Sequence, residues 1–317
     1  MAVYTVVTAE ALATLLARYD VGELVSAKGI AEGVENTNYM VDTSGKDGTG
    51  DRFILTLYEK RVDEAELPFF LFLLDHLADR DLPVPRAIRD RNGTQLQTVA
   101  GRPGCLIEFL PGFSVSTPTV AQAHATGAAL GAMHHAVAGF PGQRPNVLGL
   151  SGWHELAARC GDDLDTISPG LRSRVATELG WLDAHWPRDL EVSIIHGDLF
   201  PDNVLMRGDR VGGIIDFYFA CTEVRAWDVA ITHAAWSFDN EGRGYSAAVG
   251  DALIAGYVET HGLTANERTA FPILARGACL RFLLTRAWDW LNTPADAIVT
   301  KKDPLAFLRR LDHYAAL

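Results

Sequence analysis

One stretch limits what this chain can fold into more than any other. It reads His196-Gly197-Asp198-Leu199-Phe200-Pro201-Asp202-Asn203 and is followed by Ile214-Ile215-Asp216-Phe217. Apolar and β-branched residues at 192–195 predict a short buried strand that ends in this polar loop. A second strand is predicted at 204–206, a turn at 207–210 and a return strand at 211–215. Such a hairpin returns the chain to its starting loop, so three oxygen-bearing side chains are expected to converge: Asp198, Asn203 and Asp216.

These side chains have the chemistry that phosphoryl transfer from ATP needs. Mg²⁺ prefers hard oxygen ligands, and a separate carboxylate must orient and deprotonate the attacking hydroxyl. The spacing D-x-x-x-x-N matches the catalytic loop of protein kinases, with Gly197 in place of the usual arginine. We therefore predict Asp198 as the base and Asn203 and Asp216 as Mg²⁺ ligands. The alternative is an ordinary polar turn, but the strands on both sides favour a functional loop.

The motif H-G-D-x-x-x-x-N followed by I-D-F resembles the aminoglycoside phosphotransferase and choline kinase superfamily. One branch, the homoserine kinases of the kinase-like type, is similar over four longer runs, and the resemblance as a whole covers nearly the entire chain. These runs are 213–221, 53–61, 66–70 and 280–286.

The resemblance implies an α+β, two-lobe, protein-kinase-like fold. An N-terminal nucleotide-binding lobe, an antiparallel β-sheet with a helix, is expected at 1–107, a hinge at 108–112, and a larger, mainly helical lobe at 113–317. ATP and Mg²⁺ would bind between the lobes. The implied reaction phosphorylates the hydroxyl of L-homoserine to O-phospho-L-homoserine for threonine synthesis. Two alternatives stay open: another acceptor, such as an aminoglycoside, choline or a sugar, and a non-catalytic nucleotide-binding module.

The nucleotide site is expected in the first third of the chain. A glycine-containing strand-turn-strand would cover the phosphates with the residues Gly33, Asn36, Thr37 and Asn38, although an ordinary hairpin fits the same pattern. By position and resemblance, backbone groups from Glu108 to Leu110 would contact the adenine. Most members of the superfamily carry a lysine where this chain has Thr56. Candidates for the missing positive charge are Lys28, Lys60 and Arg61.

Homoserine needs a cation for its carboxylate, and arginine binds carboxylates with two parallel hydrogen bonds. Arg281 and Arg286 lie among apolar and aromatic residues of a predicted helix and are candidates, as is Tyr218 for the acceptor. Arg286 could instead form an internal ion pair with Asp289. Asp228 resembles the superfamily aspartate that holds the catalytic loop through backbone hydrogen bonds.

Patterns elsewhere predict the remaining elements. A helix is expected to begin at Thr8, a strand at 53–58, and a hairpin around Asn92-Gly93 with strands at 87–90 and 95–99. Residues 140–153 read as a long loop. Further helices are predicted at 63–80, 119–137, 171–186, 223–236, 245–261, 265–291 and 307–314.

Composition excludes several classes of protein. The 317 residues are 48% hydrophobic and 21% charged, which predicts a folded core. A net charge of −12 argues against a nucleic-acid binder, which usually carries a basic face, and against an anionic membrane as partner. The four cysteines are widely spaced, and the first nine residues lack the pattern of a signal peptide. We therefore expect a cytoplasmic protein with reduced thiols.

Overall fold

The structure is a computed structural model, and it describes residues 4–30, 36–59, 63–293 and 301–317. The chain divides into two compact units, Met1–Pro111 and Gly112–Leu317, and each is described by itself. None of the helices in these described ranges is long and apolar enough to cross a membrane.

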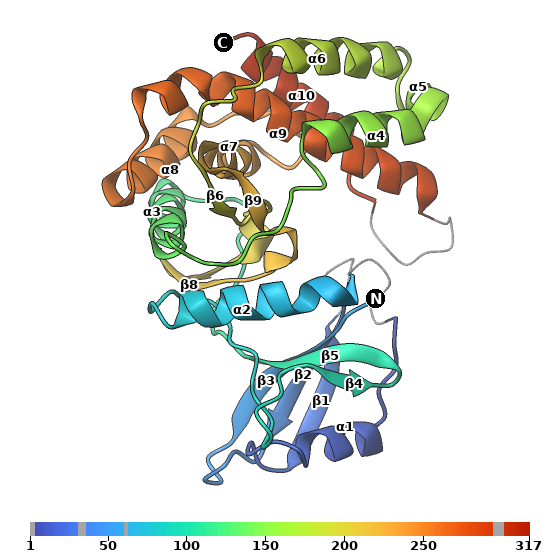
Figure 1. The fold of residues 1–317 in the computed structure, drawn as a ribbon, viewed down its shortest axis with the longest axis vertical. Helices are drawn as coiled ribbons and strands as arrows, with labels where there is room; N and C mark the ends of the chain where they lie inside the picture. Colours follow the sequence, from blue (N-terminus) through green and yellow to red (C-terminus); the bar gives the residue numbers. More distant parts are fainter. Residues whose placement is uncertain (1–3, 31–35, 60–62, 294–300) are drawn as a thin grey trace. The chain divides into compact units, whose positions relative to one another are not determined.

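The first unit is built on a five-stranded antiparallel sheet with the strand order β1-β2-β3-β5-β4 (Figure 1). Alternate residues of β2 are buried, which is the period of a strand with one face on a core. That core also takes the leucines of helix α1, whose first turn is capped by the Thr8 side chain as predicted. The strands are β1 Leu24–Ile30, β2 Thr37–Thr43, β3 Asp51–Leu57, β4 Gln97–Val99 and β5 Arg102–Glu108, and the helix α1 is Ala9–Leu16.

The predicted hairpin at 87–99 is wrong in its pairing. A turn does form at Asn92-Gly93, where the Gly93 N–H donates to Asp90 O (2.9 Å). However, β4 pairs with β5 through a turn at Ala100 and Gly101, whose φ values of 49° and 76° suit a tight hairpin. Both turns are local, and it is the second turn, at Ala100 and Gly101, that joins the two strands that pair. Helix α2, Leu67–Ala78, follows a short 3₁₀ turn at Glu64–Glu66, in the predicted region.

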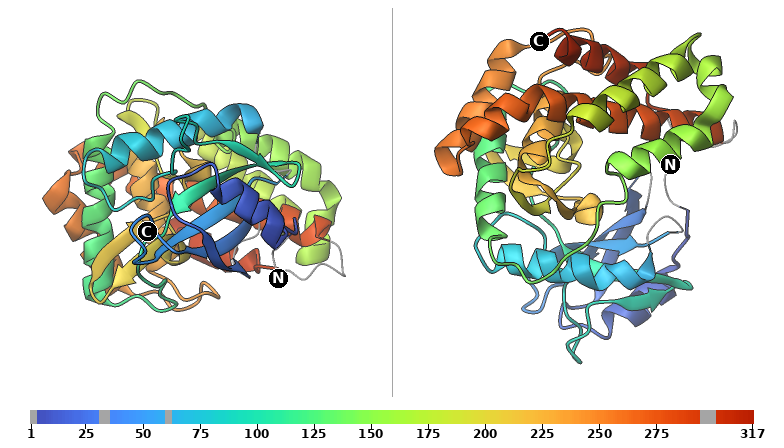
Figure 2. Two further views of the ribbon diagram at one scale, coloured as in Figure 1. Left: turned by 90° about the horizontal axis from the view of Figure 1, so that it is seen from below. Right: turned by 45° about the horizontal axis from the view of Figure 1, so that its top comes forward.

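The second unit is mainly helical, with two small two-stranded sheets. Its helices confirm five of the predicted regions, and α3 and α9 begin with capping boxes at Thr119 and Thr264. The helices are α3 Val120–Ala136, α4 Leu150–Cys160, α5 Leu164–Ile167, α6 Leu171–His185, α7 Arg225–Trp236, α8 Ala247–Thr260, α9 Ala265–Asn292 and α10 Leu305–Ala315. The long helix α9 packs against α4, α7 and α10 (Figure 2).

Two other predictions for this unit need correction. The loop predicted at 140–153 ends early, because α4 already begins at Leu150. The helix predicted from residue 223 begins at Arg225, because Cys221–Val224 forms a strand, β9, that pairs antiparallel with β6, Val192–Ile195. The sequence of β9 is short and carries no period of its own, so its partner decides its structure.

Helices α3 and α8 approach so closely that glycine is required at their contact. A Cβ atom on Gly127 would lie 1.9 Å from Leu253 O, and one on Gly256 would lie 2.0 Å from His124 O. Side chains at these positions would push the two backbones apart. This contact matters for the site, because both helices contribute residues that support the loop at Asp198.

The C-terminal helix α10 and helix α7 are joined by a buried hydrogen bond to a histidine. Because this histidine is buried, the free energy of unfolding depends on pH. Tyr314 Oη and His233 Nδ1 are 2.6 Å apart, and burial lowers the pKa of His233 from 6.5 to about 4. Between pH 6.5 and 4 the unfolded chain therefore binds the extra proton, so the free energy of unfolding falls as the pH falls.

We expect wild-type protein to lose about 2–3 kcal/mol more stability than His233→Gln when urea unfolding is compared at pH 7.5 and 4.5. The variant lacks only the imidazole that titrates. The loss of stability it shows between the two pH values therefore measures the contribution of all other groups. An equal loss in both proteins would show that His233 is not held neutral in the folded state.

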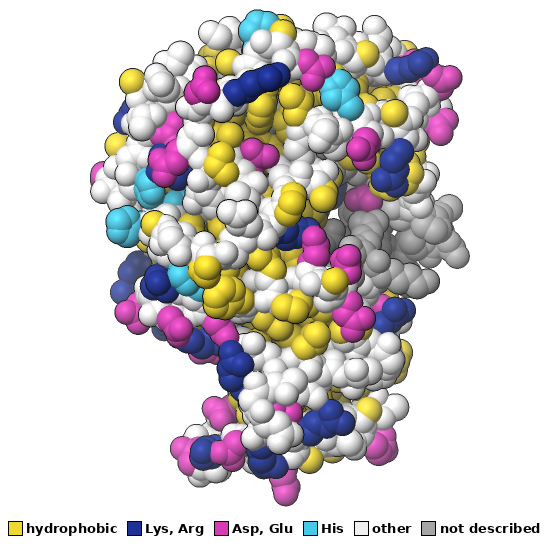
Figure 3. All heavy atoms as spheres, viewed as in Figure 1, with side chains coloured by type: hydrophobic (Ala, Val, Ile, Leu, Met, Phe, Trp, Pro, Cys, Tyr) yellow, Lys and Arg dark blue, Asp and Glu magenta, His cyan; other side chains and the backbone are white. Residues whose placement is uncertain are grey.

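Acidic and basic side chains are interspersed over the face drawn in Figure 3. Exposed ion pairs in the described residues include Lys46 with Asp20 (2.5 Å) and Arg243 with Glu241 (3.4 Å). Exposed pairs of this kind contribute little to stability, because water and salt screen them.

Candidate active site

The loop after β6 is positioned by buried strands on both sides. Ile195 ends β6, and the chain then passes through Asp198 and a 3₁₀ turn at Pro201–Asn203 into the hairpin of β7, Val204–Arg207, and β8, Arg210–Ile214. Ile215 N–H donates to Asn203 O (3.0 Å), which closes the hairpin onto the loop. The strands and their return are as predicted.

Asn203 is bound directly to Asp198. Its Nδ2 donates to the backbone oxygen of Asp198 (2.8 Å) and to Oδ2 of the same residue (3.1 Å). The two bonds fix the orientation of the amide and point its other atom, Oδ1, away from Asp198. In this orientation the Asn203 oxygen is the atom that could bind a cation.

Asp216 follows the end of β8 in a left-handed conformation, with φ 66° and ψ 60°. Non-glycine residues adopt this conformation infrequently, and it is enriched at functional sites. The Asp216 carboxylate is exposed and lies near enough to Asp198 to affect its ionisation. Burial raises the pKa of Asp198 well above its usual value, and Asp216 raises it further, while Arg281 opposes both.

The structure thus brings together the three side chains that the sequence singled out, and their assigned roles stay predictions. Two carboxylates and an amide oxygen are hard donors of the kind that Mg²⁺ takes together with phosphate oxygens and water. Burial is the main cause of the raised pKa of Asp198, and the nearby carboxylates of Asp216 and Asp202 add to it. Asn203 and Asp216 therefore fit a divalent cation.

His196 joins the two halves of the site, a role that the sequence did not reveal. Its buried imidazole contacts Ile215 O through Nε2 (3.0 Å), while Nδ1 accepts from the Asp198 N–H (3.2 Å). Desolvation lowers the pKa of His196, so the ring is neutral, with its proton on Nε2. One side chain thus ties the loop of Asp198 to the strand end before Asp216.

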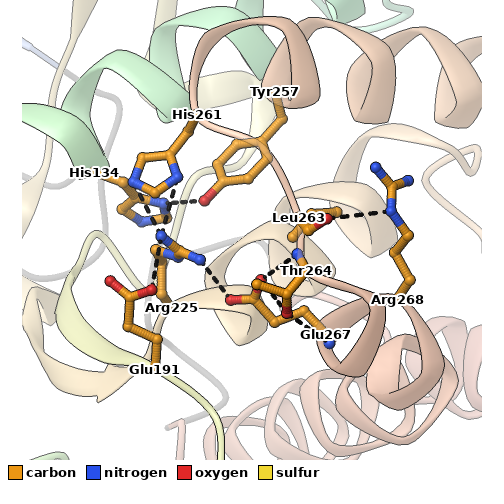
Figure 4. Close-up of polar contacts among 9 residues, drawn as sticks. All are labelled: His134, Glu191, Arg225, Tyr257, His261, Leu263, Thr264, Glu267 and Arg268. Atoms are coloured by element: carbon orange, nitrogen blue, oxygen red, sulfur yellow. Dashed lines mark hydrogen bonds and ion pairs between the residues drawn. The ribbon is translucent and has the colours of Figure 1, made fainter.

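Asp228 on α7 holds the loop that contains Asp198 through hydrogen bonds to its backbone, as the resemblance implied. Its Oδ2 accepts from His196 N (2.7 Å) and its Oδ1 from Gly197 N (2.8 Å). His134 Nε2 lies 3.1 Å from Asp228 Oδ2. The other ring nitrogen, His134 Nδ1, contacts Tyr257 Oη at 2.9 Å, as Figure 4 shows. Hydrogen bonds to the ionised form keep the pKa of Asp228 below its usual value despite full burial. His134 is thus a buried residue of helix α3.

Arg225, one turn before Asp228, forms a buried ion pair. Its guanidinium lies 2.7 Å from Glu267 Oε1 and 3.2 Å from Glu191 Oε2, and it also contacts the ring of His261 (Figure 4). Arg225 is 4% exposed and Glu267 1% exposed, so removal of one partner leaves the other charge buried.

We expect Arg225→Met to lower the free energy of unfolding by about 3 kcal/mol, measured by urea denaturation at pH 7.5. The matched control is Arg243→Met, which removes an arginine from an ion pair whose side chains are 66% and 76% exposed, and should cost less than about 1 kcal/mol. Equal effects of the two substitutions would contradict the interpretation that burial makes the Arg225 pair important.

The predicted substrate residues lie in different environments. Arg281 is 3% exposed, and its Nη1 donates to the backbone oxygen of Gly197. Arg286 is half-buried, lies over the Phe307 ring (4.5 Å), and donates a long hydrogen bond to Asp303 O (3.4 Å). Burial lowers the pKa of Arg286 to about 10, with Asp198 among the charges that oppose this shift. Tyr218 is half-buried in the 3₁₀ turn after Asp216.

The predicted nucleotide residues belong to the first unit. Asn36 Oδ1 accepts from Glu59 N (3.4 Å), and Thr37 Oγ1 accepts from the N–H groups of Tyr4 (2.9 Å) and Thr5 (3.2 Å). Asn38 Oδ1 accepts from the Thr56 hydroxyl (2.7 Å).

Of the candidate cations, Lys28 is exposed on β1. Gly33, Lys60 and Arg61 lie outside the described residues. Glu108 is exposed at the end of β5, and Leu110 is half-buried beyond it.

Comparisons with known proteins show which family the chain resembles. Residues 26–264 match the model of the phosphotransferase enzyme family. A homoserine kinase of Zymomonas mobilis is 54% identical over 99% of this chain and 97% of its own length. A homoserine kinase of Azorhizobium caulinodans is 50% identical over 100% and 97%.

Solved structures resemble the chain in fold. An amicoumacin kinase, solved with AMP-PNP and Ca²⁺, has a TM-score of 0.71 at 14% identity over 97% of this chain and 93% of that one. A choline kinase of Cryptosporidium parvum has a TM-score of 0.65 at 15% identity over 92% and 88%. The fold is therefore kinase-like, as expected from the sequence. The chain belongs to the phosphotransferase enzyme family and, within it, to the group formed by the homoserine kinases.

Proposed function

We propose that this chain transfers the γ-phosphate of ATP to the hydroxyl of L-homoserine, giving O-phospho-L-homoserine and ADP. The observation that carries the proposal is full-length identity of 47–54% to several homoserine kinases. The reaction takes place in the cytoplasm and supplies threonine synthesis.

Asp198 is the proposed base. It accepts the hydroxyl proton as the oxygen of homoserine forms its bond to the γ-phosphorus and the bond to the β,γ-bridging oxygen breaks. The Asn203 amide fixes the Asp198 carboxylate through Nδ2, and Asn203 and Asp216 would together hold Mg²⁺. When bound, the metal neutralises charge on the phosphates.

Arg286 is the proposed ligand of the homoserine carboxylate. Its guanidinium is half-buried, and Asp198 affects its pKa, so the two groups lie within electrostatic reach. A substrate held by Arg286 could present its hydroxyl toward Asp198. Tyr218, two residues after Asp216, is the proposed contact to the acceptor.

The nucleotide is proposed to bind to the first unit through Gly33, Asn36, Thr37 and Asn38 near the phosphates. Residues 108–112 form the proposed hinge between lobes at 1–107 and 113–317. Glu108 N–H donates to Arg86 O (2.8 Å), so Glu108 would contact the adenine through its carbonyl oxygen and Leu110 through its N–H.

A coupled ADP-release assay with MgATP tests the proposal. L-Homoserine should give the highest kcat/KM in a panel that contains L-serine, choline, methylthioribose and kanamycin. Selective turnover of another acceptor would replace homoserine while leaving phosphotransfer in place. ATP binding by calorimetry without ADP release on any acceptor would instead indicate a nucleotide-binding module.

A further inference from the structure

Gly197, the residue before the proposed base, is held by opposite charges on its two sides. Its N–H donates to the Asp228 carboxylate (2.8 Å), and its carbonyl oxygen accepts from the Arg281 guanidinium. The two peptide planes that flank Gly197 are therefore both fixed. Since the torsion angles of Gly197 set the direction of the chain into Asp198, the two charges together aim that carboxylate.

A side chain at position 197 would be both strained and crowded. Gly197 has φ 74°, in the left-handed region, and a Cβ atom there would lie 2.9 Å from Phe219 O. Glycine allows the loop to adopt this conformation. Because its backbone is also free to adopt others, glycine alone does not hold the loop in place. The hydrogen bonds from outside the loop supply the restraint.

Arg281 reaches this carbonyl from the middle of α9, 84 residues along the chain. Its guanidinium carbon lies 4.5 Å from the ring centre of Phe282, 5.2 Å from that of Phe219 and 5.7 Å from that of Trp227. Phe219 belongs to the 3₁₀ turn directly after Asp216. One guanidinium therefore contacts both the loop of Asp198 and the turn beside Asp216.

The environment of Arg281 differs from that expected of a substrate ligand. A ligand for a carboxylate must expose its guanidinium to the space that the substrate enters, whereas Arg281 is 3% exposed and one of its nitrogens is bonded to the backbone. Arg286, five residues further along the same helix, is half-buried. The two arginines, which the sequence placed in one role, thus have different surroundings.

We propose that Arg281 is a positioning residue: it holds the Gly197 carbonyl and, together with Asp228, aims Asp198 at the acceptor hydroxyl, while Arg286 contacts the substrate. This inference rests on the proposed function of Asp198. It assigns Arg281 an effect on kcat and Arg286 an effect on the KM for homoserine.

The test compares Arg281→Met with the matched variant Arg286→Met by steady-state kinetics with MgATP and L-homoserine. Arg281→Met should lower kcat about 100-fold and leave KM within threefold of wild type. A misoriented Asp198 carboxylate slows the chemical step but does not weaken binding of the substrate. Arg286→Met should raise KM about 10- to 100-fold. Arg281→Lys keeps a charged donor and should recover at least tenfold of the lost kcat. A raised KM with unchanged kcat in Arg281→Met, or no recovery by lysine, would overturn the proposal.

A double-mutant cycle separates positioning from a general loss of active protein. If Arg281 acts through Asp198, then Arg281→Met should change the residual rate of Asp198→Asn less than threefold, measured with radiolabelled ATP. A further 100-fold loss in the Asp198→Asn background would overturn the proposal, because it would show that the two residues act independently. If Arg281→Met does not fold, the same cycle is run with Arg281→Gln, which also removes the charge.

Failure of the homoserine assignment would be recognised separately. Wild-type protein that turned over a different acceptor would contradict the proposed substrate. The same kcat and KM comparison, run with that acceptor, would still support or overturn the role of Arg281.

Discussion

Asp198→Asn is expected to lower kcat for homoserine phosphorylation by about 10³-fold or more, with the fold intact. The asparagine side chain has nearly the same shape, so it can still contact the Asn203 amide that bonds to Asp198 Oδ2 in the wild type. It has no carboxylate to accept the hydroxyl proton, so the loss should appear in kcat rather than in KM. The assay is steady-state ADP release, normalised to folded protein.

The stability of this variant provides an independent control. Burial raises the pKa of Asp198, which means that the ionised carboxylate is disfavoured in the folded protein. In metal-free buffer near pH 7.5, Asp198→Asn should therefore be at least as stable as wild type in urea denaturation. Wild-type turnover in folded Asp198→Asn would remove this residue from the mechanism.

Asp228→Asn is expected to lower the free energy of unfolding by about 3 kcal/mol and kcat at least about 100-fold. Asp228 is fully buried, and its two oxygens are shared by the N–H groups of His196 and Gly197 and by His134 Nε2. Asparagine offers one accepting oxygen and places an NH₂ group against donors. The loop would lose the restraint that the Asp228 carboxylate provides by accepting hydrogen bonds from its two N–H groups.

The two effects are measured separately, stability by urea unfolding and kcat per folded molecule. Asp251→Asn, an exposed aspartate on α8, is the matched control and should change stability by less than about 0.5 kcal/mol. Wild-type stability and turnover in Asp228→Asn would contradict the view that this carboxylate organises the loop.

The catalytic hairpin was predictable because its signals are local. Buried apolar residues such as Ile195 and Ile214 mark its strands, and the return of the chain places Asp216 near Asn203 regardless of the rest of the fold. Capped helices were predictable for the same reason, since Thr119 caps α3 with residues only three positions away.

Features that depend on distant partners were not predictable in the same way. Cys221–Val224 forms a strand because it pairs with β6. The 87–99 hairpin failed for a different reason, because β4 pairs with its neighbour β5 through the local turn at Ala100 and Gly101, a signal that the sequence prediction did not use. The sequence offered Arg281 and Arg286 as equivalent candidates, since nothing local shows that Arg281 reaches the Gly197 carbonyl. A lone arginine in an apolar helix indicates a buried partner but does not identify it.

The most direct test of the central claim is identification of the product by mass spectrometry and ³¹P NMR after incubation with MgATP and L-homoserine. We predict a phosphate ester on the homoserine side-chain oxygen, formed in equal amount to ADP by wild-type protein and absent with Asp198→Asn. ADP formed without O-phospho-L-homoserine, or product formed equally by Asp198→Asn, would contradict the account.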